Sequence, residues 1–395
     1  LIRKPVVHLK IFIADYLIDI FEVTGMESNQ TTSSAELNLK LERIRELLIK
    51  CDLDALLLQK TENFAWATCG GDAHIYLADS LGIASLLITR TNHFVVTNNI
   101  EATRLRQEGG LGEQGWEFKV SPWLEGDNEI ASLTHGMKFG ADTSYPQALD
   151  LSREIASVRS QLTPEEGNRF RELGQLCAQG MRQSIEAVKP GMSEYEIAGL
   201  LAQSVESKGV QVVVNLVATD ERIFSYRHPL PSAKKLRNYA MLVLCGRKWG
   251  LICSLTRLVN FGKLPDEVRH KAEAVALIDA EMIAATRPGR TLGDIFRRAQ
   301  AVYAASGYPG EWQLHHQGGS AGYAPREVTA RPTSAEPVRV GQAFAWNPSI
   351  TGTKSEDTIL VGEESNEIIT EMAAWPSIDI QVGEQVIKRP AILEK

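Results

Sequence analysis

The chain has 395 residues, of which 44% are hydrophobic and 23% are charged, and its formal net charge at pH 7 is −7. This length predicts two domains, each with enough sequence to bury a core. Because the charge balance is acidic and no long basic block is present, the sequence argues against nucleic-acid or membrane-surface partners.

The five cysteines are scattered and form no CxxC pair, which predicts reduced thiols in a cytoplasmic protein rather than a disulfide framework. Residues 1–25 are apolar-rich but are interrupted by Lys10, Asp15 and Asp19, which is not typical of a signal peptide or a membrane span. We expect an upstream extension here, disordered or non-native up to residue 35, with the natural start at Met26. An amphipathic anchor is the alternative.

Residues 36–161 alternate between strand and helix patterns. Apolar side chains at helical spacing predict a helix over residues 35–50, and a buried strand follows at 54–58. Residues 83–88 and 93–97 predict a strand pair. A helix is expected at 100–108 and a short strand at 137–141. This alternation predicts an α/β domain.

A second domain is expected over residues 162–385, followed by a tail at 386–395. Thr163, Pro164 and Glu166 predict the capped start of a helix running to residue 188, and Ser193 with Glu196 predicts a second capped start. Strands are expected at 212–217, 241–244 and 249–251, and helices at 265–285 and 291–306. Helices followed by antiparallel strands predict an α+β fold.

Residues 341–361 predict strand, turn, strand, with an Asn347-Pro348 break and a Thr351-Gly352 turn. Together with residues 189–197, this stretch resembles the pita-bread metallopeptidases, the family of aminopeptidase P, prolidase, methionine aminopeptidase and creatinase. The resemblance covers nearly the whole chain after residue 36. It implies a smaller creatinase-type α/β N-terminal domain followed by an α+β pita-bread domain.

The family binds two divalent ions, such as manganese, cobalt or zinc, through two Asp, one His and two Glu. In this chain the matching positions hold, in order, Leu244, Ser254, the His motif His315-His316, Asn347 and Glu356. Three carboxylates are therefore replaced, and the resemblance predicts neither metal ligands nor a cofactor.

A metallopeptidase with substituted ligands remains an alternative. Cys245 and Cys253 adjoin the lost positions, and thiolates suit zinc. Because neighbours in a strand face opposite sides, we expect both thiols to point away from the ligand side, as buried core cysteines.

Creatinase resembles this family in fold but cleaves a C–N bond without metal, using a histidine as acid and base. The corresponding residue here is His228, which precedes Pro229. The reference pKa of histidine, roughly 6.5, suits this work. The alternative is a loop histidine without a catalytic role.

The His motif also matches creatinase in spacing. Arg326 and Glu327 follow His315 by eleven and twelve residues, and Tyr323 matches as well. Arg326 would hold a substrate carboxylate through paired N–H donors, with a surface Arg-Glu ion pair as the alternative. Strand alternation predicts that only one of His315 and His316 enters the site.

The sequence thus predicts a cytoplasmic, homodimeric hydrolase of the aminopeptidase P/prolidase/creatinase type. It would act without metal on a peptide-like or amidino C–N bond of a small molecule or short peptide. His228 would be the general acid and base, and Glu356 would orient a cationic substrate group or hold His228. The remaining expected site residues are His315 and His316 for catalysis and Arg326, Glu327, Tyr323 and Asn347 for substrate. The alternative is a pseudopeptidase that binds peptides or proteins without cleaving them.

Overall fold

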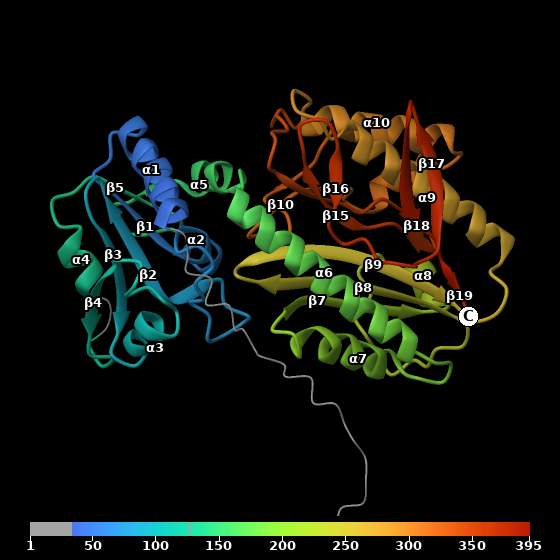
Figure 1. Ribbon diagram of the computed structural model, residues 1–395, viewed down its shortest axis with the longest axis horizontal. Helices are drawn as coiled ribbons and strands as arrows, with labels where there is room; N and C mark the ends of the chain where they lie inside the picture. The colour runs from blue at the N-terminus through green and yellow to red at the C-terminus, as the bar shows by residue number, and fades with distance from the viewer. Residues whose placement is uncertain (1–33, 126–127) are drawn as a thin grey trace, which may run out of the picture.

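The computed structural model describes residues 34–125 and 128–395, which form two domains (Figure 1). The extension expected over residues 1–25 and the start expected at Met26 lie outside the described residues. Within the described ranges, no helix is both long enough and apolar enough to cross a membrane.

The N-terminal domain alternates strands and helices, as the sequence predicts. Its elements are α1 (Ser34–Lys50), β1 (Ala55–Lys60), α2 (Thr61–Ala67), β2 (Leu81–Thr89), β3 (His93–Asn98), α3 (Ala102–Gln107), β4 (Glu117–Ser121), α4 (Asn128–Leu133), β5 (Phe139–Ala141), β6 (Leu149–Asp150) and α5 (Ser152–Arg159).

These strands form one sheet in the order β4-β3-β2-β1-β5-β6, with β2 and β3 antiparallel and β1 and β5 parallel. Alternation along β1 gives the sheet two buried faces. Leu56 and Leu58 pack in one core with α1 and α2, while Leu57 packs on the other face with Ile130 of α4.

The C-terminal domain begins with two helices and continues with strands and further helices. Its elements are α6 (Pro164–Ala187), α7 (Glu194–Glu206), β7 (Gln211–Thr219), α8 (Glu221–Ser225), β8 (Tyr239–Lys248), β9 (Leu251–Asn260), α9 (Asp266–Ala285), α10 (Leu292–Ala305), the 3-10 helix η1 (Glu311–Leu314), β10 (Gly318–Ala321), β11 (Val328–Thr329), β12 (Ala343–Trp346), β13 (Ser349–Ile350), β14 (Thr353–Lys354), β15 (Asp357–Val361), β16 (Asn366–Ile368), β17 (Ser377–Val382), β18 (Gln385–Pro390) and β19 (Leu393–Glu394).

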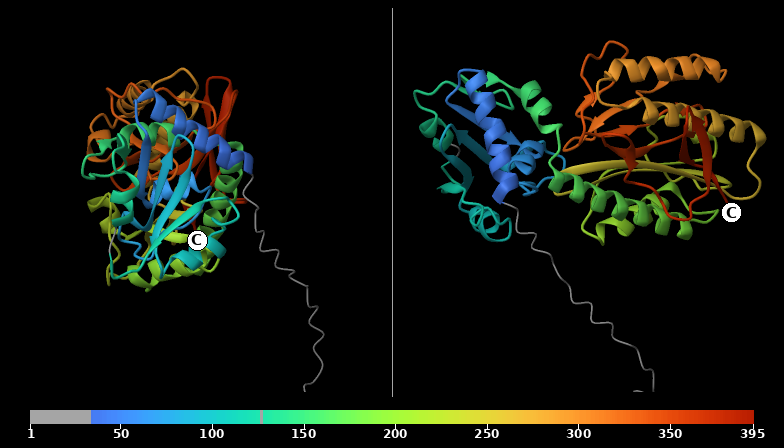
Figure 2. Two further views of the ribbon diagram at one scale, coloured as in Figure 1. Left: turned by 90° about the vertical axis from the view of Figure 1, so that its left-hand side faces the viewer. Right: turned by 45° about the horizontal axis from the view of Figure 1, so that its top comes forward.

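Two sheets dominate this domain, in the orders β19-β9-β8-β7 and β11-β10-β12-β15-β16. They meet where the backbone N–H of Thr256 donates to the carbonyl of Glu356 at 3.1 Å. Helices α6 and α7 lie along the first sheet, and α9 and α10 lie on the opposite side of the domain (Figures 1 and 2). The candidate site residue Glu356 therefore lies at the junction between the two sheets, beside Thr256.

Both predicted helix starts are present. Thr163 and Glu166 form a capping box at α6, and Ser193 and Glu196 form one at α7. The tail expected at 386–395 needs correction, because β18 pairs with β17 and β19 joins the sheet beside β9. The alternation of polar and apolar residues there is too short to predict these pairings.

Buried charged side chains join the two domains. Lys40 of α1 lies 2.8 Å from Glu36 and 2.7 Å from Glu166 of α6, and Arg169 pairs with Glu36 at 2.6 Å. The β8–β9 turn contacts the N-terminal domain, because a Cβ placed on Gly250 would lie 2.3 Å from that of Ala65. These contacts fix the hairpin that carries Ser254.

Candidate functional site

The register of the β8–β9 hairpin decides which side chains face the site. A two-residue turn joins the strands, and both Trp249 and Gly250 have positive φ, 52° and 76°. This register places Cys245 opposite Ser254, with 3.2 Å between Sγ and Oγ. Leu244, expected at the first Asp position, packs in the core shared with α6.

The expectation that Cys245 points away from the site is therefore wrong. The position of the β8–β9 turn decides which residues of the two strands lie opposite each other, and the sequence motif does not show where that turn lies. Cys253 does point away, and its Sγ lies 4.0 Å from the carbonyl of Leu173 in α6. Burial, together with Glu356, raises the pKa of the Cys245 thiol to about 11. The two thiols lie on opposite faces, so they cannot bind one zinc ion together.

Glu356 is buried and is bound by cations. Lys354 Nζ lies 2.7 Å from Oε2 and Arg326 Nη2 lies 3.0 Å from Oε1, while Thr256 Oγ1 donates to Oε2 at 2.7 Å. Burial alone would raise the pKa of Glu356, but Lys354 and Arg326 lower it to about 2. Both oxygens of Glu356 are thus used by these groups rather than by His228.

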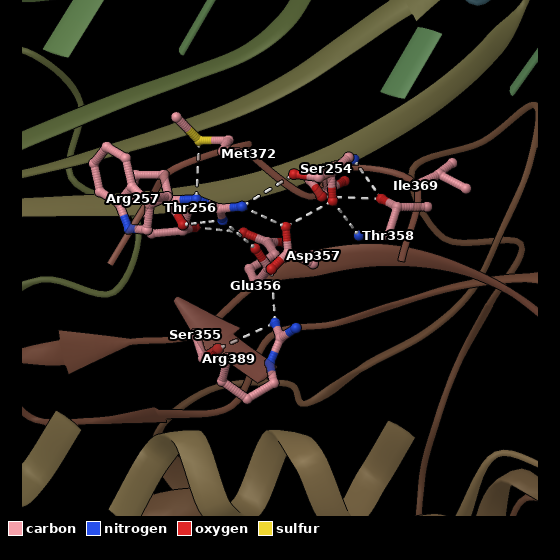
Figure 3. Close-up of polar contacts among 12 residues, drawn as sticks. Ser254, Thr256, Arg257, Ser355, Glu356, Asp357, Thr358, Ile369, Met372 and Arg389 are labelled. Carbon is pink, nitrogen blue, oxygen red and sulfur yellow. Dashed lines mark hydrogen bonds and ion pairs between the residues drawn. The ribbon is translucent and has the colours of Figure 1, made fainter. Parts of the chain in front are cut away.

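A second set of buried ions holds the start of β15 in place (Figure 3). Asp357 Oδ1 accepts from Arg257 Nη2 at 2.8 Å, and Asp357 Oδ2 accepts from Arg389 Nη2 at 2.7 Å. Arg389 also pairs with Asp279 at 2.6 Å. Because Asp357 follows Glu356 directly, this network fixes the backbone that carries the site carboxylate.

Asn347 and Ser254 are the neutral residues that the resemblance assigns to two of the family's carboxylate positions. Asn347 is 2% exposed, and its Oδ1 has no hydrogen-bond partner among the described residues. Ser254 Oγ accepts from Arg326 Nη1 at 3.3 Å. The expected ligand positions therefore hold one amide, one hydroxyl, one aliphatic side chain, the histidine motif and one carboxylate already paired with two cations, and the Cys245 thiol lies beside Ser254. A carboxylate-bridged pair of divalent ions does not fit this set.

Three histidines gather beside these residues. The Nε2 atoms of His228 and His315 lie 2.9 Å apart, and the rings of His315 and His316 have centroids 4.4 Å apart. The ring centroids of His228 and His316 are 5.8 Å apart. The expectation that only one of His315 and His316 enters the site is wrong, because both precede β10 and lie outside its regular alternation.

All three imidazoles are held neutral. Partial burial, and then the ammonium of Lys354, lowers the pKa of His228. Burial followed by Lys354 lowers the pKa of His315 to about 2, and burial followed by Arg326 lowers that of His316 to about 4. His315 is 9% exposed and its Nδ1 has no partner among the described residues, whereas His228 and His316 are exposed.

The space beside His315 is small. A cavity of about 10 Å³ is lined by Lys354, Ser349, Arg227 and neighbouring side chains, enough for roughly one water molecule. Any substrate must therefore approach from the side where His228 and His316 are exposed.

Three expected substrate residues are committed to protein contacts. Tyr323 is 2% exposed and its hydroxyl donates to Glu166 at 2.6 Å. Glu327 pairs with Arg159 and accepts the backbone N–H of Tyr323 at 2.9 Å. Tyr323 and Glu327 thus belong to the domain junction, which local spacing cannot reveal. Both terminal nitrogens of Arg326 are bonded, to Glu356 and Ser254.

Sequence reasoning missed Lys354 and Thr256. Lys354 stands two residues before Glu356, and in an extended chain this spacing places two side chains on the same side. The sequence could therefore have predicted that Lys354 pairs with Glu356. Thr256 carried no comparable signal, because its contact with Glu356 joins strands from two different sheets.

Known proteins share this architecture. The chain is 25% identical to an uncharacterized peptidase of Staphylococcus aureus (strain MW2) over 234 residues, which is 56% of this chain. The chain spans 65% of that relative's length. A prolidase from Pyrococcus horikoshii OT3 superposes with a TM-score of 0.74 and 19% identity, covering 85% of this chain and 99% of the prolidase.

A Xaa-Pro dipeptidase from Bacillus anthracis superposes with a TM-score of 0.75 and 18% identity, covering 91% of this chain and 100% of the dipeptidase. These superpositions confirm an α/β N-terminal domain followed by a pita-bread domain. Residues 168–363 match the model of metallopeptidase family M24. The C-terminal domain of this chain is therefore similar to metallopeptidase family M24 over these residues.

Proposed function

We propose that this protein is a hydrolase that cleaves a peptide-like or amidino C–N bond of a small substrate without a metal in the chemical step. The observation that carries the proposal is the contact of His228 with His315, 2.9 Å between Nε2 atoms, beside Lys354 and Arg326. Reactive imidazoles persist where the carboxylates for two ions are lost. The Xaa-Pro dipeptidase and the prolidase suggest short peptides as the first substrates to try.

His228 would act as the general base and then as the general acid. It is neutral and exposed, so it can accept a proton from an attacking water and return it to the leaving nitrogen. His315 supports this role through the Nε2 contact, in which one ring donates and the other accepts.

Lys354 and Arg326 would stabilise negative charge at the reacting carbonyl. Together with Glu356 they carry two positive charges and one negative charge, so the group has one net positive charge. Fixed cations in a partly buried site stabilise a developing oxyanion without reorganising. This arrangement would take over the electrostatic task of the family's ions.

The decisive experiment is turnover in the presence of EDTA. Purified protein is screened against Xaa-Pro dipeptides and creatine-like amides, and His228→Ala is compared with His270→Ala, which changes an exposed histidine on α9. We expect His228→Ala to lower kcat by a factor of about 10² to 10⁴, while His270→Ala leaves it unchanged. Equal turnover by the wild type and His228→Ala would remove His228 from the mechanism.

A pseudopeptidase that only binds peptides is the second candidate. It is favoured by Glu356, whose two oxygens are both bound by protein groups, and by the one-water cavity beside His315. Saturable peptide binding without turnover across the whole screen would select it.

We further propose a homodimer in the cytoplasm. All five cysteines are free thiols, in keeping with a reducing compartment. Light scattering on the eluting protein gives the molar mass in solution, and a monomer at micromolar concentration would contradict the dimer.

A further inference from the structure

We propose that His228, His315 and His316 form a mononuclear site for a divalent metal ion that prefers imidazole ligands, with Zn²⁺ as the reference ion. Each residue offers one ring nitrogen, and the three ligand atoms lie within 4.8 Å of one another. This site differs in ligands and in ion number from the carboxylate-bridged pair that the surrounding residues do not fit.

The spacing of the nitrogens suits one ion. Zn–N bonds are about 2.0–2.1 Å long, so tetrahedral ligand nitrogens lie roughly 3.3–3.4 Å apart. The Nε2 atoms of His228 and His315 are 2.9 Å apart, and all three ligand atoms lie within 4.8 Å of one another, so the observed spacings bracket that value. Three imidazoles leave a fourth position for water, and the exposed His228 and His316 give the ion a path from solvent.

The backbone that carries two of the ligands is firmly held. Gln317 Nε2 donates to the carbonyl of His315 at 2.6 Å, and Gln317 Oε1 accepts from the hydroxyl of Tyr303 at 2.8 Å. The hydroxyl oxygen of Tyr303 in turn accepts the backbone N–H of Ser349 at 2.9 Å. Such support limits the reorganisation that binding requires.

Nearby charges shape which ions can bind. Lys354 and Arg326 are both paired with Glu356, which leaves one net positive charge near the imidazoles. That charge weakens the binding of every dication, so ions with strong affinity for nitrogen gain an advantage. We expect the order Cu²⁺ > Zn²⁺ > Co²⁺ > Mn²⁺ and no binding of Mg²⁺, which requires oxygen ligands.

One consequence rests on the proposed function. A bound ion would use the nitrogen lone pair that His228 needs as a base, so Zn²⁺ should inhibit hydrolysis rather than support it. Metal binding itself does not depend on that function, and it is therefore measured separately.

The test is direct binding to metal-stripped protein. Zn²⁺ is titrated by calorimetry, and Co²⁺ is followed by its visible absorption, for the wild type and for His228→Gln and His316→Gln. We expect one ion per chain and at least about tenfold weaker binding in each variant. Both changed residues are exposed, so folding should survive, and circular dichroism checks this.

Cys245→Ser and His270→Gln are the matched controls. Cys245 faces Ser254 at the family's ligand positions, and His270 is an exposed histidine outside the cluster. Unchanged affinity in both controls supports the three-histidine site. Absence of Zn²⁺ binding, or equal affinity in His228→Gln and the wild type, overturns it, whether or not the protein hydrolyses any substrate.

Discussion

Lys354 Nζ lies 2.7 Å from Glu356 Oε2, and both side chains are almost completely buried. An ammonium group thus compensates the buried carboxylate of Glu356. Lys354→Met removes one of the two cations that bind this buried carboxylate and leaves Arg326 as its partner, so we expect the free energy of unfolding to fall by about 1–3 kcal/mol. Denaturant unfolding at neutral pH measures this loss.

The double variant Lys354→Met/Glu356→Gln should not regain that loss, because it leaves the guanidinium of Arg326 without its carboxylate partner. Lys388→Met, which changes an exposed lysine of β18, serves as the control and should stay within about 0.5 kcal/mol of the wild type. A Lys354→Met protein as stable as the control would show that Arg326 alone compensates Glu356.

Gly250 permits the β8–β9 turn to dock against the N-terminal domain. Its φ is +76°, and an added Cβ would lie 2.3 Å from the Cβ of Ala65 and 2.9 Å from Tyr323. Gly250→Ala should therefore add an overpacking cost of about 1–3 kcal/mol to the roughly 1 kcal/mol cost of positive φ. Limited proteolysis should also cut the domain junction faster.

Gly289→Ala isolates the backbone contribution to this loss. Gly289 has a similar φ of +85°, but an added Cβ there meets nothing within 4 Å. We expect this variant to lose only about 1 kcal/mol and to keep the proteolysis pattern of the wild type. Equal losses in the two variants would show that the contact with Ala65 adjusts without cost.

Local signals predicted the fold and part of the site. Capping residues such as Thr163 and Ser193 fixed where helices begin, because a cap depends on neighbours in sequence. The resemblance assigned His228 and one histidine of the His315-His316 motif to a common site, whereas the structure brings all three rings together. The positions that failed depend on distant contacts. Cys245 faces the site because of the turn register, and Tyr323 and Glu327 serve the domain junction because α5 and α6 reach them.

The thiols should differ sharply in reactivity. Cys51 is half-buried, whereas Cys69, Cys177, Cys245 and Cys253 are buried. Burial raises the pKa of Cys69 to about 12 and that of Cys245 to about 11, so neither forms thiolate at neutral pH.

Iodoacetamide should therefore modify Cys51 first in the folded protein, and the four buried thiols only after unfolding. Peptide mass spectrometry over a time course reports each site, and Cys51→Ser should remove the fast phase. Modification of Cys245 at a rate similar to that of Cys51 would mean that the space beside Ser254 opens to solvent in the native state.

The ion cluster of Glu36, Lys40 and Arg169 between the domains should make the free energy of unfolding depend on pH. Burial opposes ionisation of Glu36, but Arg169 and Lys40 lower its pKa below the ordinary value of 4.5. Below pH 4.5 the unfolded chain therefore takes up a proton that the folded chain still excludes. The contribution of the Glu36 charge to the free energy of unfolding is complete above pH 4.5. It is lost as the pH falls toward the lowered pKa of the folded state, by at most about 1.4 kcal/mol per pH unit.

Glu36→Gln should be less stable than the wild type at pH 7, and the difference should shrink as the pH falls from 5 to 3. Glu42→Gln changes an exposed carboxylate on the same helix and should follow the wild type throughout. Chemical denaturation at a series of pH values gives both curves. The effect arises only if the unfolded state binds a proton that the folded state does not. Parallel curves of unfolding free energy against pH for the wild type and Glu36→Gln would therefore mean that Arg169 and Lys40 do not stabilise the charge of Glu36.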